Sequence, residues 1–281
     1  MGRFFLFLWA ILSGLMAFEF YRLHKNPQHS FLFYLQSRHL LKSTFEIGPE
    51  NHALVLVTGY GGLGLMILTN LYIFRKRIHA LTKLGFLKNW LDFHIFCGMM
   101  GPTLILFHCD FKVHGLVAIS FWSMVVSVSS GIIGRYFYIQ ISKLRGDFVR
   151  EAEAFNVKIK AYITKVKAEI SDTDLVRYRT QALVFAGADA VPSNPLSALV
   201  FSMITDVKMA VRPVPAPPPL GEVGQYLFKG YALNMRKANT VDSFNRLMGY
   251  WHTFHMPFAI FMYIAAVLHV AAEFWLGNAT F

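Results

Sequence analysis

Four histidines in two apolar segments form a pattern that occurs twice in the chain. His94 and His108 lie in one segment, and His255 and His269 lie in the other. Thirteen residues separate the members of each pair, which corresponds to about 21 Å along an α-helix. Fourteen steps of about 100° end about 40° short of four turns, so the two imidazoles of a pair lie on nearly the same helix face. Each helix therefore offers two nitrogen ligands, one toward each side of a bilayer.

Two such helices side by side would form two sites with two imidazoles each. The inner site would pair His94 with His255, and the outer site would pair His108 with His269. Two axial imidazoles suit a haem iron that transfers electrons, because they leave no coordination position for a substrate. Polar groups within lipid are costly and usually functional. Zinc is a weaker interpretation, since it takes three or four protein ligands, and histidines that only bridge helices are the remaining alternative.

The segments HIFCGMMGPTLILFH and YWHTFHMPFAIFMYIAAVLH resemble the haem-bearing helices of di-haem b-type membrane cytochromes. That group includes the cytochrome b of quinol-oxidising complexes and the membrane part of ferric reductases and NADPH oxidases. The resemblance covers two helices and does not separate these families. It implies two b-type haems as cofactors, with His94 and His255 on the inner iron and His108 and His269 on the outer iron, and a quinone as a candidate further cofactor.

The composition indicates an integral membrane protein. Hydrophobic residues make up 55% of the chain and charged residues 15%, against the usual quarter. The net charge of +11 is expected at loops and membrane surfaces, where it would favour anionic lipid or an acidic redox partner. The basic residues flank apolar segments and match no nucleic-acid-binding motif, so nucleic acid is not an expected partner.

The cysteines exclude several kinds of second redox centre on this chain. Cys97 and Cys109 are about 18 Å apart on one helix, too far for a disulfide. The sequence has no C-x-x-C-H motif for a c-type haem and no cysteine cluster for an iron–sulfur centre. It also lacks P-loop, flavin and nicotinamide motifs. A further redox cofactor would therefore belong to a partner subunit, such as a c-type cytochrome, an iron–sulfur protein or a flavin protein.

The hydrophobic pattern predicts an all-α bundle of about five transmembrane helices. We expect these spans at residues 4–21, 52–74, 90–109, 114–138 and 250–276. Residues 1–138 would hold four spans, residues 139–249 a long helical insertion, and residues 250–281 the fifth span. The first apolar run is interpreted as an uncleaved anchor rather than a signal peptide, because it is long and no A-x-A site follows it.

The basic segment 75–88 contains no acidic residue and sets the predicted orientation. Positive charge favours the cytoplasmic side, which places the N-terminus and the insertion in the cytoplasm and the protein in an inner, plasma membrane. Within the insertion we expect an amphipathic helix at 144–170 and a second polar helix at 232–246. Between them we expect an apolar segment at 193–207, which is too short to span, and an extended proline-rich linker at 213–219. The insertion would dock a partner or cap the inner haem, and its apolar segment would lie at the interface or pack on other helices.

Several residues near the histidines are candidates for supporting roles. Gly98 and Gly101 lie near the histidine face, where glycine gives room for a macrocycle or lets another helix pack closely. Arg135 suits a haem propionate, although a positive-inside anchor is an equal interpretation. His252, one turn before His255, would bond a propionate or compete as the inner ligand.

The glycine-rich stretch 59–64 lies inside an apolar span and follows no strand, so a nucleotide-binding loop is not expected. Small residues there would let a helix or a haem plane approach closely. The spare histidines His52, His114 and His252 leave a third haem open.

The expected function is that of a di-haem cytochrome b subunit. It would carry electrons across the bilayer between a quinone pool and a redox partner subunit, with no catalytic residue of its own. The first alternative is a ferric-reductase-like protein that passes electrons from a cytoplasmic donor to an external acceptor. The second is a membrane anchor without redox activity.

Overall fold

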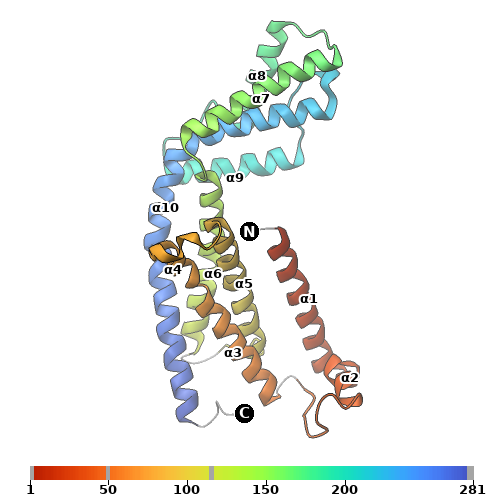
Figure 1. Ribbon diagram of the computed structural model, residues 1–281, viewed down its shortest axis with the longest axis vertical. Helices are drawn as coiled ribbons and strands as arrows, with labels where there is room; N and C mark the ends of the chain where they lie inside the picture. Colours follow the sequence, from red (N-terminus) through yellow and green to blue (C-terminus); the bar gives the residue numbers. More distant parts are fainter. Residues whose placement is uncertain (1–2, 49–50, 114–116, 277–281) are drawn as a thin grey trace. The chain divides into compact units, whose positions relative to one another are not determined.

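The computed structural model describes residues 3–48, 51–113 and 117–276, and these ranges contain helices and no strand (Figure 1). The prediction of an all-α protein is confirmed. The chain divides into two compact units. Unit 1 comprises Met1–Gly131 and Met256–Phe281, and unit 2 comprises Ile132–His255.

Within the described residues, five helical segments are long and apolar enough to cross a membrane. They are α1 (Arg3–Lys25), α3 continued by α4 (His52–Leu68 and Leu71–Arg77), α5 (Leu87–His108), α6 (Val117–Gln140) and α10 (Gly221–Trp275). These segments coincide with the five predicted spans, except that the predicted start of the fourth, His114, lies outside the described residues. The chain is therefore a multi-pass helical membrane protein whose spans contact lipid.

An acidic side chain near the end of α1 organises the polar segment that follows it. Glu19 accepts hydrogen bonds from the backbone N–H groups of Phe31 and Leu32, at 2.8 and 3.1 Å. These groups belong to the first turn of α2 (Phe31–Ser37), which follows the short 3-10 helix η1 (Pro27–His29). The first N–H groups of a helix have no partner within the helix, so a carboxylate stabilises this end.

The second span is interrupted at Thr69 and Asn70, between α3 and α4, where a tyrosine from α10 binds. The hydroxyl of Tyr263 donates to the carbonyl oxygen of Met66 at 2.5 Å. It also accepts from the Asn70 amide at 2.9 Å and lies 3.0 Å from the Thr69 hydroxyl. This cluster fixes the part of α10 in unit 1 against α3.

Helices α3 and α5 pack at small residues. A Cβ atom on Gly101 would lie 2.9 Å from Cγ of Met66 and 3.0 Å from the carbonyl oxygen of Gly62. Close backbone approach of this kind is typical of helix pairs in membranes. Beside it, Met66, Met124 and Met262 form a buried cluster between α3, α6 and α10.

The basic segment 75–88 begins in the last turn of α4, and its residues form hydrogen bonds within the protein rather than being freely solvated. Arg75 is buried, and its guanidinium donates to the carbonyl oxygen of Gly85 at 2.9 Å. The indole of Trp90 donates to the carbonyl oxygen of Leu84 at 2.6 Å. These bonds close the loop around the 3-10 helix η2 (His79–Lys83), so one of the cations in this segment has a structural role.

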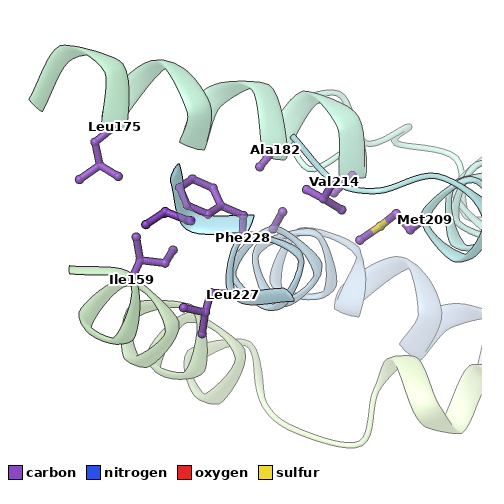
Figure 2. Packing of buried hydrophobic residues seen from close by; sticks show 10 residues of the cluster. Ile159, Leu175, Ala182, Met209, Val214, Leu227 and Phe228 are labelled. Carbon is purple, nitrogen blue, oxygen red and sulfur yellow. The ribbon is translucent and has the colours of Figure 1, made fainter. Parts of the chain in front are cut away.

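Unit 2 contains the predicted insertion, and its helices surround a separate apolar core. The helices are α7 (Arg145–Val166), α8 (Asp172–Ala186), α9 (Pro195–Val211), the short η3 (Pro218–Leu220) and the first part of α10. Figure 2 shows Phe228 of α10 near Ile159 of α7 and Leu175 of α8, and all three are buried. The insertion is therefore a packed helical body rather than a loose loop.

Two predicted boundaries differ from the structure. Residues 232–246 and 250–276 were expected as separate helices, but both belong to α10, a single helix of 55 residues. The change from a polar to an apolar sequence near residue 250 does not end the helix, and α10 also continues through Pro257. Unit 2 runs from the last turns of α6 to His255 within α10, and Phe137 of α6 packs with Phe244 of α10 in this region.

Candidate functional site

Four helices of unit 1 enclose a cavity of about 360 Å³ beside the C-terminal ends of α5 and α10. This volume lies within the range of about 300–1,000 Å³ that is usual for ligand sites. Both C-terminal ends line the same cavity, so α5 and α10 run in the same direction within unit 1. The predicted pairing of His108 with His269 requires this direction. The lining comes from α3, α5 with the turn after it, α6 and α10.

The structure brings the predicted outer pair of histidines to this cavity. His108 lines it from the last turn of α5, and His269 lines it from α10. The rest of the wall is mostly apolar and includes Val55, Leu56, Leu63, Met66, Ile105, Val117, Phe121, Met124, Ala266 and Val270. An apolar pocket with a few polar groups is the usual form of a cofactor site.

The hydrogen bond of His108 sets its tautomer. The Nδ1 atom lies 2.6 Å from the carbonyl oxygen of Val55, on α3. A carbonyl can only accept, so Nδ1 carries a proton, and in the neutral form of the ring Nε2 has a free lone pair. Histidines that bind metals are commonly held in this way, with the nitrogen that does not bind the metal donating to a backbone carbonyl. His108 is therefore prepared to act as a ligand through Nε2.

A glycine in α3 makes this arrangement possible. A Cβ atom on Gly59 would lie 2.7 Å from Nδ1 of His108 and 2.8 Å from its Cε1. Any other residue at this position would collide with the imidazole. The glycine-rich stretch was predicted to allow a helix or a haem plane to approach, and here Gly59 admits a side chain from the neighbouring helix.

Polar groups gather near His269 and around the adjoining turn. Glu273, one turn after His269, has an oxygen 3.8 Å from Nδ1 of that histidine, which is beyond hydrogen-bond distance but close enough for charge interaction. Lys112 also lines the cavity, and its Nζ lies 2.8 Å from a carboxylate oxygen of Asp110. The hydrogen bond from Lys112 is the main cause that lowers the pKa of Asp110 from its ordinary value.

The inner histidine of α5 is held in a similar way. Nδ1 of His94 lies 2.9 Å from the carbonyl oxygen of Thr69, at the interruption between α3 and α4. The ring of Tyr72 lies 5.5 Å away, centroid to centroid. Since the carbonyl again only accepts, His94 also has its proton on Nδ1 and presents Nε2.

The histidines at the start of the fifth span share an aromatic neighbour. The ring of His255 is stacked on Trp251 at 4.7 Å with 20° between the planes, and His252 meets the same indole nearly edge-on at 6.5 Å. Both histidines belong to unit 2, whereas His94 belongs to unit 1. The pairing of His94 with His255, and the choice between His255 and His252, stay predictions.

The remaining predicted site residues have identifiable surroundings. Gly101 contacts α3, which is the helix-packing role, while a Cβ on Gly98 would meet only a methyl group of Thr69 at 3.9 Å. The guanidinium of Arg135 lies 5.6 Å from the centroid of the Tyr138 ring. Whether Arg135 binds a propionate and whether Gly98 faces a macrocycle stay predictions.

Sequence reasoning missed three groups that shape this region. Glu273 could have been found, because it lies four residues after His269 and therefore on the same helix face. Lys112 had a weak signal, as a cation in the short turn after His108. Tyr263 had none, because a tyrosine inside an apolar span is common and only packing shows what its hydroxyl reaches.

Among the residues that the structure describes, no three His, Cys, Asp or Glu side chains converge as a set that could hold a metal ion. A haem brings its own porphyrin nitrogens and takes only axial ligands from the protein, so a histidine pair suffices for it. The cavity lined by His108 and His269 fits that requirement in its ligand atoms and its apolar lining.

Comparisons of the chain with protein-family models, with curated proteins and with solved structures found no match. The site is therefore interpreted from its own residues.

Proposed function

We propose that this chain is an electron-transfer subunit of a membrane and that His108 and His269 bind a b-type haem in the cavity of unit 1. One observation carries the proposal: the imidazoles of His108 and His269, from helices that run in the same direction, line a single apolar cavity that His52 of α3 also lines, and the Nδ1 bond of His108 leaves its Nε2 available for a metal. A haem with two axial histidines exchanges single electrons and offers no position to a substrate.

The other residues of the cavity would bind and shield the cofactor. The apolar side chains exclude water, which strengthens the charge interactions that remain. Lys112 would attract a negatively charged propionate, since it is the cation that lines this cavity among the described residues. The Val55 carbonyl keeps the His108 ring in one orientation before and after the cofactor binds.

A second haem would lie between His94 and His255. Support comes from the Nδ1 bond of His94, which repeats the arrangement at His108, and from the fourteen-residue repeat on both helices. The two irons would then lie at levels about 21 Å apart, and electrons could pass from one side of the bilayer to the other.

The electron donor and acceptor are proposed from the sequence. Because the sequence carries no motif for another cofactor, we propose a quinone pool at one end of the path and a redox subunit at the other, in an inner membrane. Reduction of the haems by a quinol analogue, blocked by a quinone-site inhibitor, would support this assignment. Reduction by a soluble cytoplasmic donor that such an inhibitor leaves unchanged would instead support a ferric-reductase-like protein.

The direct test is a haem count per chain on purified protein. We expect two haems in the unmodified chain and one in either His108→Ala or His269→Ala. His79→Ala is a matched control, because His79 lies in the short 3-10 helix η2 and does not line the cavity, and it should keep both haems. A far-ultraviolet circular dichroism spectrum shows that each variant is folded. A purified chain without a Soret band, or the same pigment content in all variants, would leave the protein as an anchor.

A further inference from the structure

Six large apolar side chains form one face of α9, and each is more than half exposed. They are Leu196, Val200, Met203, Ile204, Val207 and Val211. At about 100° per residue they fall within an arc about 100° wide. We call these six residues the bare face of α9.

The opposite face of α9 is packed inside unit 2. It consists of Ala198, Ser202, Thr205 and Met209, which are buried. Its centre lies about 180° around the helix from the centre of the bare face. A surface helix in water normally turns its larger apolar residues inward, but on α9 Met209 is the one large apolar residue among the four buried ones, and six large apolar residues face outward.

The charged side chains of α9 interact with other residues of unit 2 and are not part of the bare face. Asp206 forms an ion pair with the buried guanidinium of Arg236. Lys208 donates to the carbonyl oxygen of Phe185 at 3.2 Å, and its Nζ lies 4.1 Å from the centroid of that ring. The bare face is therefore uniformly apolar along its length.

The contacts of α9 fix its level relative to a membrane span. Asp206 accepts hydrogen bonds from Tyr136 at 2.7 Å and from Gln140 at 3.3 Å. Both donors belong to the last turns of α6, whose membrane-spanning stretch ends at Gln140. Leu199 of α9 packs against the buried cluster that Phe137 of the same turns forms with Phe244 and Leu247. In Figure 1, α9 runs crosswise to this end of α6, so it lies at the end of the candidate span.

The bare face is specific to α9 within unit 2. On the longer helix α7, the large apolar side chains that are exposed are Val149, Val157 and Val166, eight and nine residues apart, with charged residues between them. Single exposed apolar residues are normal on protein surfaces, whereas a contiguous apolar face marks a site of interaction.

We propose that α9 is an in-plane membrane helix, with its bare face in the boundary between lipid headgroups and acyl chains. The occupant is the bilayer because α9 is fixed to the end of a transmembrane helix and its exposed face carries no charge. Helices of this kind bury their apolar face about 5–10 Å into the boundary. The proposal does not depend on haem binding.

The test is a spin-label accessibility scan of the full-length protein in phospholipid bilayers. Each residue from 196 to 211 is replaced by cysteine in turn and labelled with a nitroxide, in a Cys109→Ala background because Cys97 is fully buried. Collision with oxygen reports lipid, and collision with a water-soluble nickel chelate reports water. The matched control is Val157→Cys on α7, since Val157 and Ile204 are 60% and 64% exposed.

We expect the ratio of oxygen to nickel collisions to oscillate along α9 with a period of about 3.6 residues. The maxima should fall on the bare face, and the ratio at Ile204→Cys should exceed that at Val157→Cys several-fold. Equal access of nickel at both positions would show that the face lies in water. Shielding of Ile204→Cys from both reagents would show that a second copy or another subunit covers it. Either result overturns the proposal.

Discussion

The histidines at the two ends of α5 each form a hydrogen bond to a backbone carbonyl of the second span, but the local structure that allows the bond differs. At the outer end, His108 reaches the carbonyl of Val55 inside an intact stretch of α3, because Gly59 leaves room for the ring. At the inner end, His94 reaches the carbonyl of Thr69 where the helix is interrupted. The absence of a side chain at Gly59 and the interruption of the helix at Thr69 thus have the same result. In both places an imidazole donates through Nδ1 and leaves Nε2 available.

The two ends differ in where the second histidine comes from. The outer pair, His108 and His269, lies within unit 1 and lines one cavity. The inner pair draws His94 from unit 1 and His255 from unit 2. The comparison teaches that the members of the outer pair belong to one packed unit and line one cavity, whereas the members of the predicted inner pair belong to different units. Four predictions test this difference.

The largest effect is expected when both α5 histidines are removed. His94→Ala with His108→Ala should abolish both haems, and each single change should remove one. Haem is counted by the pyridine haemochrome spectrum, and redox titration identifies the haem that remains. If the two single variants retained a haem of the same midpoint potential, the assignment of separate inner and outer sites would be wrong.

Gly59→Ala should damage the outer site alone. The added methyl would meet the His108 ring at 2.7 Å, so the ring must move, and overpacking of this kind costs about 1–3 kcal/mol. Changes that disturb the orientation of a metal ligand weaken binding by about 10- to 100-fold. Haem occupancy and the midpoint potential of each haem are the measurements.

The matched control for this change is Gly64→Ala in the same glycine-rich stretch, where a Cβ would meet nothing within 4 Å. It should leave both haems unchanged. Equal loss of haem in the two variants would mean that the stretch needs glycine for some reason other than His108.

Tyr263→Phe should loosen α10 against α3 without touching a ligand. It removes the hydrogen bonds of the hydroxyl, while the carbonyl of Met66 still accepts from the Thr69 hydroxyl at 2.6 Å and the Asn70 amide still donates to the carbonyl of Ile67 at 3.1 Å. The expected cost is therefore that of a made hydrogen bond, about 0.5–1.5 kcal/mol. We expect a lower thermal midpoint in detergent and a modest loss of the outer haem. Tyr250→Phe is the control, because Tyr250 is exposed. Equal stability of the two variants would show that the tyrosine cluster is not needed to hold α10.

The smallest effect is expected from Lys112→Gln. Loss of a positive charge near the outer haem stabilises its oxidised form, so the midpoint potential should fall by the equivalent of about 1 kcal/mol or less. The inner haem should not change. The pKa of Asp110 should rise toward its ordinary value, because the hydrogen bond from Lys112 is its main depressing cause. An unchanged outer potential would place Lys112 outside the haem environment.

The sequence predicts the elements well and the contacts only in part. Spans and histidine spacing follow from periodicity, which is a local property, and all five spans are confirmed. The interruption at Thr69 and Asn70 could not be predicted, since neither residue stops a helix and the bonds from Tyr263 come from a distant segment. For the same reason, the sequence shows that His94 and His108 share a face but not which carbonyl each ring meets.

The Nδ1 bonds also bear on protons. An imidazole that donates to a carbonyl through one nitrogen and binds a metal through the other has no lone pair left to accept a proton. With a metal on Nε2, His108 would act as a ligand and not as a base. A proton acceptor in this cavity would then be another lining group, and Glu273, with an oxygen 3.8 Å from Nδ1 of His269, is the carboxylate that lines it among the described residues.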